Sequence, residues 1–387
     1  MKDLALIVMI GPLGIHPLER QMGWILRVAA QETIRRIVRT GRVDRVILAA
    51  PDSEGLESLG HASFPLELDL DPVHQPFEFG VRLAELIQRH RVSRLLYVGA
   101  GAAPLMSAAD WDAVLAEFAE VREGLVTNNL HSSDWVAVAP AEAVPPYAHR
   151  LPTDNAMAWV LHREAGLPVR VWPRSTASLL DLDTPVDALI VAQHPQVPAA
   201  LREAVARTGW DPSRVQRIQA LLRTPGSRLV LAGRVPSWAW AALERHAHVW
   251  TRVFSEERGM QASARMHRGE VRSLVYAYLQ AVGPSRFFET LGELADGALL
   301  DIRVWMAAAG RWPEPVDRYA ADLFAVSEIQ DPVIREWIEA AAQAPLTVLV
   351  GGHTVVSAGL VALLEAALGI PRIALSGGLA IGGSAGD

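Results

Sequence analysis

Residues 5–14 read ALIVMIGPLG, an apolar run that passes directly into a loop of glycine and proline. The first six of these residues are all apolar, as in a β-strand that is buried on both faces of a sheet. The loop Gly11–Gly14 leads into a helical pattern that ends near Gly41. A strand, a short glycine loop and a helix in this order are typical of a parallel α/β sheet.

Similar strand and helix patterns follow through the N-terminal half of the chain. Further strands are predicted at residues 43–49, 64–70, 94–98, 135–139 and 169–171, with helices at 77–89 and starting near 108. This alternation predicts a Rossmann-like, mostly parallel sheet in an N-terminal domain of residues 1–195.

Prolines interrupt the pattern between Ala192 and Pro212, which predicts a domain boundary there. A second, more helical α/β domain is expected over residues 213–372. Its strands are predicted at 228–232, 249–254 and 346–350, and residues 264–345 are expected to be mostly helical. The last residues, 376–387, are rich in glycine, alanine and serine and are expected to form a flexible tail.

Composition excludes several kinds of chemistry. Lysine and arginine total 36 in 387 residues, Lys2 is the only lysine, and cysteine is absent. A P-loop and Schiff-base catalysis both need lysine, and thiolate nucleophiles need cysteine. The net charge of −7 argues against nucleic acid as a partner, and no apolar run is long enough to span a membrane. We expect a soluble, cytoplasmic protein.

Two glycine loops follow predicted strands, at the ends where open α/β sheets bind ligands. The first contains Gly11 and Gly14 and is followed by Arg20, and the second contains Gly99 and Gly101. Glycine lets the backbone approach a phosphate, and arginine can bind it through two hydrogen bonds. The first loop lacks the G-x-G-x-x-G pattern, so a dinucleotide site is not predicted. Either loop can instead be a simple tight turn.

Two aspartates stand two residues apart just before a predicted helix. On an extended segment, Asp181 and Asp183 project to the same side and can share one Mg²⁺ with phosphate oxygens. Thr184 and Pro185 then begin the helix as its N-cap and first residue. The alternative is that Asp183 and Thr184 only cap that helix.

Short polar side chains between these segments are further candidates for reading a base, a ribose or a polar acceptor. They are Asn128, Asn129, Ser133, Asp134, Asp154 and Asn155. The alternative role is structural, because asparagine and aspartate also stabilise turns through their own backbone.

The second half offers a separate set of candidates. Glu256 and Arg258 follow a predicted strand, and Gly351, Gly352 and His353 lie between a strand and a helix, where an anion can bind. A structural role is the alternative for His353. We expect intrahelical ion pairs among Asp301, Arg303, Asp317, Arg318 and Asp322.

The segment Leu180–Asp187 resembles the Asp-x-Asp-Thr-Pro-x-Asp motif of nucleotidyltransferases of the molybdopterin and phospholactate guanylyltransferase type. The first strand with its glycine loop and the segment Val98–Leu105 add to the resemblance, which covers roughly residues 3–193. It implies a nucleoside triphosphate in the first loop and Mg²⁺ near Asp181 or Asp183. It also implies that an acceptor phosphate attacks the α-phosphorus and that pyrophosphate leaves.

The sequence departs from this family pattern at two places. Ala102 stands where the family has a metal-binding aspartate, and no lysine follows the first loop, where Arg20 or Arg27 would carry the charge. The leading hypothesis is a nucleotidyltransferase that acts on a nucleotide and a phosphorylated small molecule. Its C-terminal domain would supply acceptor specificity or homodimer contacts. The alternatives are a diverged nucleotide- or phosphate-binding protein without turnover, and an enzyme whose site lies in the C-terminal domain.

Overall fold

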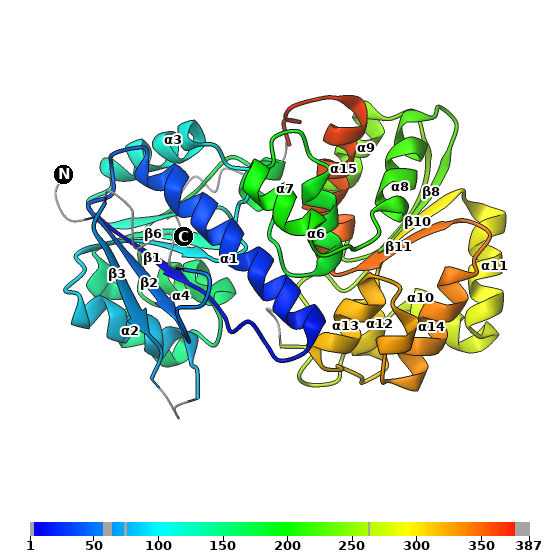
Figure 1. The fold of residues 1–387 in the computed structure, drawn as a ribbon, viewed down its shortest axis with the longest axis horizontal. Helices are drawn as coiled ribbons and strands as arrows, with labels where there is room; N and C mark the ends of the chain where they lie inside the picture. Colours follow the sequence, from blue (N-terminus) through cyan, green and yellow to red (C-terminus); the bar gives the residue numbers. More distant parts are fainter. Residues whose placement is uncertain (1–3, 57–63, 73–75, 262–263, 376–387) are drawn as a thin grey trace, which may run out of the picture.

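Two β-sheets, each covered by helices, lie side by side along the long axis of the molecule (Figure 1). The structure is a computed structural model that describes residues 4–56, 64–72, 76–261 and 264–375. The tail predicted at residues 376–387 therefore lies outside the described residues.

The first sheet has seven strands in the order β3-β2-β1-β4-β6-β5-β7, and only β6 runs antiparallel to its neighbours. The strands are β1 (Leu4–Met9), β2 (Arg45–Ala50), β3 (Leu66–Leu70), β4 (Arg94–Gly99), β5 (Gly124–Thr127), β6 (Trp135–Ala139) and β7 (Val169–Val171). The prediction of a Rossmann-like, mostly parallel sheet is confirmed, while the four-residue strand β5 was not predicted.

Helices cover both faces of this sheet. They are α1 (Pro17–Val38), α2 (Phe79–Arg89), α3 (Ala108–Ala119), α4 (Met157–Arg163), α5 (Thr176–Leu179) and α6 (Pro185–Ala192), with 3₁₀ turns η2 (Ala141–Ala143), η3 (Pro145–Arg150) and η4 (Asp154–Ala156). In β1, Leu6 and Val8 pack in the same cluster as α1 and α3, while Ile7 packs in the cluster of α2 and α4. The all-apolar sequence of β1 thus reflects burial on both faces, as predicted.

The second sheet has four parallel strands in the order β11-β10-β8-β9. They are β8 (Arg228–Gly233), β9 (Trp250–Ser255), β10 (Gly297–Asp301) and β11 (Thr347–Gly351). The helices are α7 (Ala199–Ala206), α8 (Ser213–Arg223), α9 (Ser237–His246), α10 (Leu274–Val282), α11 (Pro284–Leu294), α12 (Arg303–Ala308), α13 (Pro315–Asp322), α14 (Pro332–Ala342) and α15 (Ala358–Leu368), with 3₁₀ turns η5 (Val326–Glu328) and η6 (His353–Val356). The predicted helical α/β region is present, although β10 lies inside the stretch that was expected to be mostly helical.

The intrahelical ion pairs expected between residues 301 and 322 are wrong. Asp301 ends β10 and binds Arg234 of the loop after β8, with 2.6 Å between Nε and Oδ2. Arg303 on α12 binds Asp322 on α13 at 2.8 Å, so this pair joins two helices. Asp317 accepts hydrogen bonds from backbone N–H groups of residues 330 and 331. Helical spacing alone cannot exclude partners from other elements.

One buried apolar cluster runs through both halves of the molecule. It contains Val8 of β1, Val186 of α6, Leu231 of β8 and Leu363 of α15. A buried contact also crosses between the halves, since His194 Nε2 lies 3.1 Å from Glu365 Oε2. Helix α1 likewise begins beside α13 (Figure 1). None of the helices in the described segments combines the length and hydropathy that a membrane span requires.

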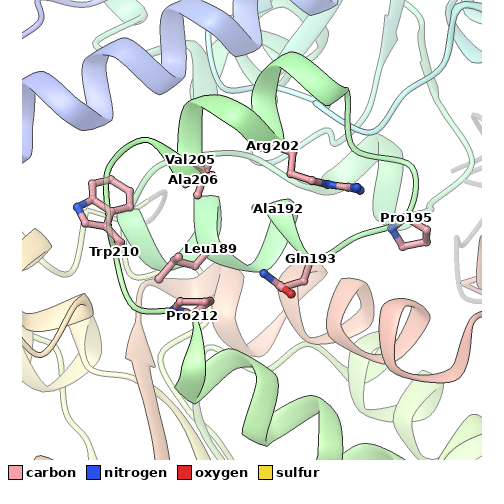
Figure 2. Close-up of a pocket in the computed structure, with 9 residues that line it drawn as sticks. All are labelled: Leu189, Ala192, Gln193, Pro195, Arg202, Val205, Ala206, Trp210 and Pro212. Carbon is pink, nitrogen blue, oxygen red and sulfur yellow. The ribbon is translucent and has the colours of Figure 1, made fainter.

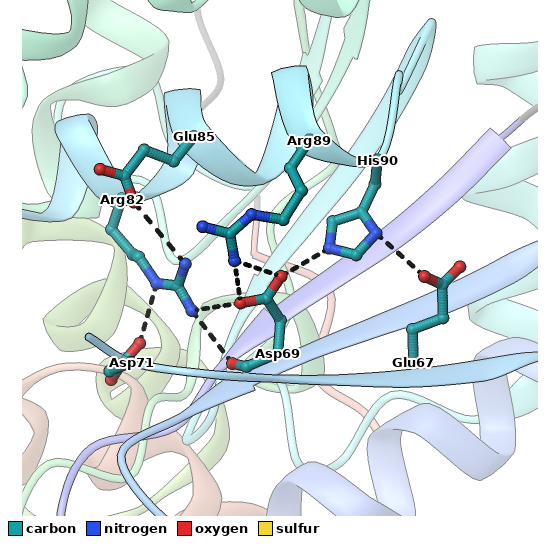
Figure 3. Close-up of polar contacts among 7 residues, drawn as sticks. All are labelled: Glu67, Asp69, Asp71, Arg82, Glu85, Arg89 and His90. Carbon is teal, nitrogen blue, oxygen red and sulfur yellow. Dashed lines mark hydrogen bonds and ion pairs between the residues drawn. The ribbon is translucent and has the colours of Figure 1, made fainter. Parts of the chain in front are cut away.

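A polar network fastens helix α2 to the edge strand β3 (Figure 3). Asp69 Oδ1 accepts hydrogen bonds from Arg82 Nη2 at 2.9 Å and from Arg89 Nη1 at 2.6 Å, and His90 Nε2 lies 2.7 Å from Oδ2. Burial raises the pKa of Asp69, but the hydrogen bonds with Arg82, His90 and Arg89 outweigh burial and lower it to about 2. The ionised carboxylate therefore stabilises the edge of the sheet.

Replacing Asp69 by asparagine is expected to lower the free energy of unfolding by about 2 kcal/mol at neutral pH. The pKa of Asp69 falls from 3.8 unfolded to about 2 folded, so its contribution is present above pH 3.8 and is lost as the pH falls through about 2. Urea unfolding of both proteins across this range measures the difference.

As a matched control, Glu85→Gln removes a contact of 3.7 Å to Arg82 from a side chain that is 38% exposed. That control is expected to change stability by less than about 0.5 kcal/mol. Equal losses in the two variants would contradict the role given to Asp69.

Candidate active site

Two short backbone segments pair with each other at the carboxyl end of β4. The N–H of Ala103 donates to the carbonyl of Leu180 at 3.0 Å, and the N–H of Leu182 donates to the carbonyl of Gly101 at 3.1 Å. Residues 102 and 181 thereby form an isolated antiparallel bridge. A Cβ atom on Gly101 would lie 2.5 Å from the carbonyl oxygen of Leu182, so only glycine permits this approach. The bridge brings the second glycine loop and Asp181 together.

Two more aspartates lie at the same edge of the sheet. Because β6 is antiparallel, Asp134, just before its first residue, lies beside the last residue of β4, and the N–H of Gly99 donates to its carbonyl at 3.0 Å. Asp154 Oδ2 accepts a hydrogen bond from the hydroxyl of Tyr97 at 2.9 Å and would lie 3.3 Å from a Cβ on Gly99. Asp134, Asp154, Asp181 and Asp183 thus gather around residues 99–101, and together we call them the carboxylate cluster.

The pKa values of Asp134, Asp154 and Asp181 are raised within this cluster. For Asp181 the largest cause is burial, followed by the charges of Asp183, Asp134 and Asp154 and a hydrogen bond with the Asp183 side chain. For Asp134, burial and the charge of Asp154 outweigh the opposing hydrogen bond from Asn128. The pKa of Asp154 rises to about 6 because of burial, against the hydrogen bond from Tyr97, with the charge of Asp183 adding to the rise. A cation bound here would relieve this repulsion.

The predicted polar side chains hold the loops around the cluster. Asn128 Nδ2 donates to Asp134 Oδ2 at 2.6 Å, and its Oδ1 accepts from the N–H of Asp134 at 3.1 Å. The hydroxyl of Ser133 donates to a backbone carbonyl of the neighbouring loop at 2.9 Å. Asn129 and Asn155 use their side-chain oxygens as acceptors within the same loops. These side chains therefore position the aspartates through turn-type contacts.

The start of helix α6 leaves the carboxylate of Asp183 outside the helix cap. Thr184 is the N-cap residue, and its hydroxyl donates to Asp187 Oδ2 at 2.9 Å. The backbone N–H of Asp183 donates to the same oxygen at 3.2 Å. Asp187 is therefore the carboxylate that serves the cap. The side chain of Asp183 is exposed beside Asp181, where it can contact a ligand.

The first glycine loop contacts its own helix. Gly14 has a φ of +80°, and the side chain of His16 caps α1 as part of a capping box with Glu19. Arg20 Nη2 donates to Glu54 Oε1 at 2.7 Å, and both side chains are about half exposed. The structure thus places Arg20 beside Glu54, with Gly11 exposed in the loop before it. Neither Arg20 nor Gly11 has a described contact with the carboxylate cluster.

Arg27 occupies the region where the family pattern expects a lysine. Its side chain is fully buried, Nη1 lies 2.9 Å from Asp52 Oδ1, and it also donates to the backbone carbonyl of Glu54. Its guanidinium therefore stabilises the loop after β2.

The candidates in the second half do not converge on one point. Glu256 accepts hydrogen bonds from the Ser273 hydroxyl at 3.1 Å and from the first N–H of α10 at 2.9 Å, so it caps that helix. Arg258 is exposed in the loop after β9. His353 follows β11, where a Cβ on Gly352 would lie 3.9 Å from Thr184 Cγ2. Of the second-half candidates, residues 351–353 lie next to the segment that carries Asp183.

Three groups in this region were not predicted as site residues from the sequence. Tyr97 is a buried strand residue whose hydroxyl binds Asp154, and the pattern of apolar residues around it hid this role. Asp187 was predicted only as part of the motif, and its hydrogen bond with Thr184 at the start of α6 was not. Arg234 and Asp301 form an ion pair at the carboxyl edge of the second sheet. A signal for Arg234 exists, since it follows a predicted strand within a glycine loop.

The carboxylate oxygens of the cluster suit Mg²⁺, with the protein supplying only some of the ligands of the ion. Within residues 4–56, 64–72, 76–261 and 264–375, no group of three or more histidine or carboxylate side chains is arranged to hold a metal ion. Mg²⁺ is commonly held by one or two carboxylates together with substrate phosphates and water. Asp181 and Asp183 fit that mode.

A separate cavity of about 460 Å³ lies between helices α6, α7 and the start of α8 (Figure 2). Its walls are mostly apolar, with Trp210 at one end and Pro195 at the other (Figure 2). None of the residues predicted from the sequence as site residues lines it. The cavity and the carboxylate cluster are thus formed by different residues.

The fold resembles solved structures over about half of the chain, whereas no protein-family model and no curated protein matches the sequence. One structure is a 4-diphosphocytidyl-2C-methyl-D-erythritol synthase from Anaerococcus prevotii DSM 20548, with 11% identity, a TM-score of 0.35, and coverage of 54% of this chain and 99% of that chain. Another is a cytidylyltransferase from Leptospira borgpetersenii serovar Hardjo-bovis, with 10% identity, a TM-score of 0.38, and coverage of 54% and 95%. A likeness at this level concerns the fold and carries no chemistry over to this chain.

Gly101→Ala is expected to lower the free energy of unfolding by about 2 kcal/mol, because both hydrogen bonds of the bridge would have to open. Thermal and urea unfolding measure the loss. Gly11→Ala is the matched control, since a Cβ there meets no atom within 4 Å, and its effect should stay within about 0.5 kcal/mol. Comparable stability of the Gly101 and Gly11 variants would refute the close approach.

Asp154→Asn is expected to stabilise the protein by about 2 kcal/mol above pH 6 when no divalent cation is present. The folded pKa is raised from 3.8 to about 6, so the contribution of the acid is full below pH 3.8 and is lost as the pH rises through about 6. Asparagine keeps an acceptor for Tyr97 and removes the charge. Unfolding free energies in EDTA at several pH values measure the gain.

Asp110→Asn should show the opposite sign and serves as the control. Burial raises the pKa of Asp110, but hydrogen bonds with Arg372 and Ser107 outweigh burial and lower it to about 2. This variant is therefore expected to be less stable at neutral pH. A loss of stability in Asp154→Asn would show that repulsion within the cluster is not the dominant effect.

Proposed function

We propose that the protein is a nucleotidyltransferase that transfers a nucleoside monophosphate from a nucleoside triphosphate to a phosphorylated small molecule. The observation that carries this proposal is the carboxylate cluster at the carboxyl edge of the first sheet. It adjoins β4, and the order of the first sheet reverses between β1 and β4. Ligands of open α/β sheets bind outside the carboxyl ends of strands at such a reversal.

The chain's own residues would divide the work as follows. Asp181 and Asp183 would hold Mg²⁺, which neutralises charge on the phosphates when bound. The loop of Gly11 and Gly14 would cover the nucleotide, and Gly99 and Gly101 would let the backbone approach it closely. Asn128 and Tyr97 would hold the carboxylates of Asp134 and Asp154 in position, so that the site keeps its negative charge.

In the proposed reaction an oxygen of the acceptor phosphate forms a bond to the α-phosphorus of the triphosphate. The bond from that phosphorus to the bridging oxygen breaks, and pyrophosphate leaves with the electron pair. Catalysis would rest on positioning and charge stabilisation, since no covalent intermediate is needed. Ala102 removes one carboxylate of the family pattern, and in this chain Asp134 and Asp154 supply two from the neighbouring loops.

The second candidate function is binding of a nucleotide without turnover. The observation that favours it is the ion pair between Arg27 and Asp52. Because of this pair, Arg27 is not free to bind the phosphates in place of the lysine of the family pattern. The release of pyrophosphate separates the two functions.

Asp183→Asn is expected to weaken Mg²⁺-dependent binding of a nucleoside triphosphate by at least about tenfold, because one anionic ligand of the cation is lost. Calorimetric titration with ATP, GTP, CTP and UTP, each with Mg²⁺, measures the affinity. Asp112→Asn is the matched control, since this aspartate is 47% exposed and pairs with Arg42 on the surface. It should leave the affinity unchanged.

Pyrophosphate release with a panel of phosphorylated acceptors then decides between transfer and binding alone. Release by the wild type and its loss in Asp183→Asn would support the transferase. Binding without release would favour the second function. If none of the four nucleotides bound to the wild type, both proposals would fail.

A further inference from the structure

The second sheet has a strand reversal of its own. Its order, β11-β10-β8-β9, places β9 on one side of β8 and β10 on the other. In an open parallel sheet, the carboxyl ends at such a reversal form the usual binding crevice. The loop after β8 and the last residue of β10 lie at that position.

An arginine and a buried aspartate are built into this edge. Arg234 Nε and Nη2 donate to the two oxygens of Asp301 at 2.6 and 3.1 Å, and Asp301 is fully buried. A Cβ on Gly233 would lie 2.5 Å from the Cβ of Asp301, which holds the two loops in close contact. Among the described contacts, Nη1 of Arg234 has no hydrogen bond. The guanidinium is therefore fixed in place with donors left over.

His353 lies at the end of the neighbouring strand β11 and is half-buried. Its ring makes no hydrogen bond within the described part of the chain. The charges that act on it are Arg234 and Asp301 from its own sheet and Asp183 from the segment before α6. The turn η6, which begins at His353, also packs against β8 and β10, so His353 lies at the carboxyl edge that carries Arg234 and Asp301.

The edge of the second sheet contacts the segment that carries Asp183. A Cβ on Gly351 would lie 2.6 Å from Val186 Cγ1, and one on Gly352 would lie 3.9 Å from Thr184 Cγ2. The carboxylate cluster repels anions, whereas Arg234 and His353 offer N–H donors at the sheet edge that contacts the segment after Asp183. An anionic substrate that reacts near Asp183 would be bound most favourably by these donors.

We propose that Arg234 and His353 bind a phosphate group, and that this group belongs to the acceptor of the transfer reaction. The phosphate site rests on the second sheet alone, and its assignment to an acceptor rests on the proposed function. The C-terminal half thereby acts as the acceptor-binding half of the enzyme. The nucleotide and the acceptor approach each other from opposite sheets.

The test uses the full chain with ¹⁵N-labelled histidine and inorganic phosphate as the probe. The ring signals of His353 are identified by their absence in His353→Gln. Without nucleotide and at constant pH, inorganic phosphate is expected to shift these signals saturably. Acetate at equal ionic strength should not shift them, which separates phosphate from carboxylate binding.

The Arg234→Gln/Asp301→Asn double variant should weaken phosphate binding at least about tenfold, because the fixed guanidinium is removed without leaving a buried charge unpaired. The matched control is Arg228→Gln/Asp296→Asn. That pair has the same chemistry, at 2.7 Å, and lies at the opposite end of the same strands. Its phosphate affinity should equal that of the wild type, and thermal unfolding of both variants verifies that they are folded.

Three outcomes would overturn the proposal. If phosphate did not shift His353, the phosphate site would be refuted, while nucleotide binding and pyrophosphate release would still stand. Equal weakening in both double variants would refute the role of Arg234. If phosphate bound but no nucleotide did, the assignment to an acceptor would be refuted.

Discussion

The backbone pairing of residues 101–103 with residues 180–182 is the contact on which the candidate site depends. It fixes Asp181 at the carboxyl end of β4, and α6 begins soon after it, at Pro185. Helix α6 then packs in the apolar cluster that both sheets share. Two hydrogen bonds therefore connect the position of the carboxylates to the packing of the whole molecule, and the absence of a side chain at Gly101 makes them possible.

The carboxylate cluster opposes the stability that the rest of the fold provides. Burial and mutual repulsion raise the pKa values of Asp134, Asp154 and Asp181, so each favours its protonated form. Elsewhere, as at Asp69, arginines neutralise buried carboxylates and lower the pKa. Asp134, Asp154 and Asp181 have no arginine partner among the described contacts, so their site is suited to an external cation.

The sequence was sufficient where local pattern and fold agree. The apolar run of β1 and the motif at residues 180–187 predicted the first sheet and the position of the aspartates before α6. Strands β5 and β10 were missed because their short sequences, GLVT and GALLD, do not distinguish a strand from a buried helix segment. The meeting of Asp134 with Asp181 depends on the antiparallel direction of β6, and the pairing of Arg303 with Asp322 depends on how two helices pack. Neither is encoded in spacing along the chain.

The shared apolar cluster also determines how the two sheets can move. Separating them would expose side chains such as Val186 and Leu363, at roughly 1.5–3 kcal/mol for each one fully exposed. It would also break the buried contact between His194 and Glu365. A hinge at this junction would therefore be costly, and packing holds the two sheet edges in a fixed position relative to each other. Under the proposed function, two binding sites held at a fixed separation would select pairs of substrates by their combined length.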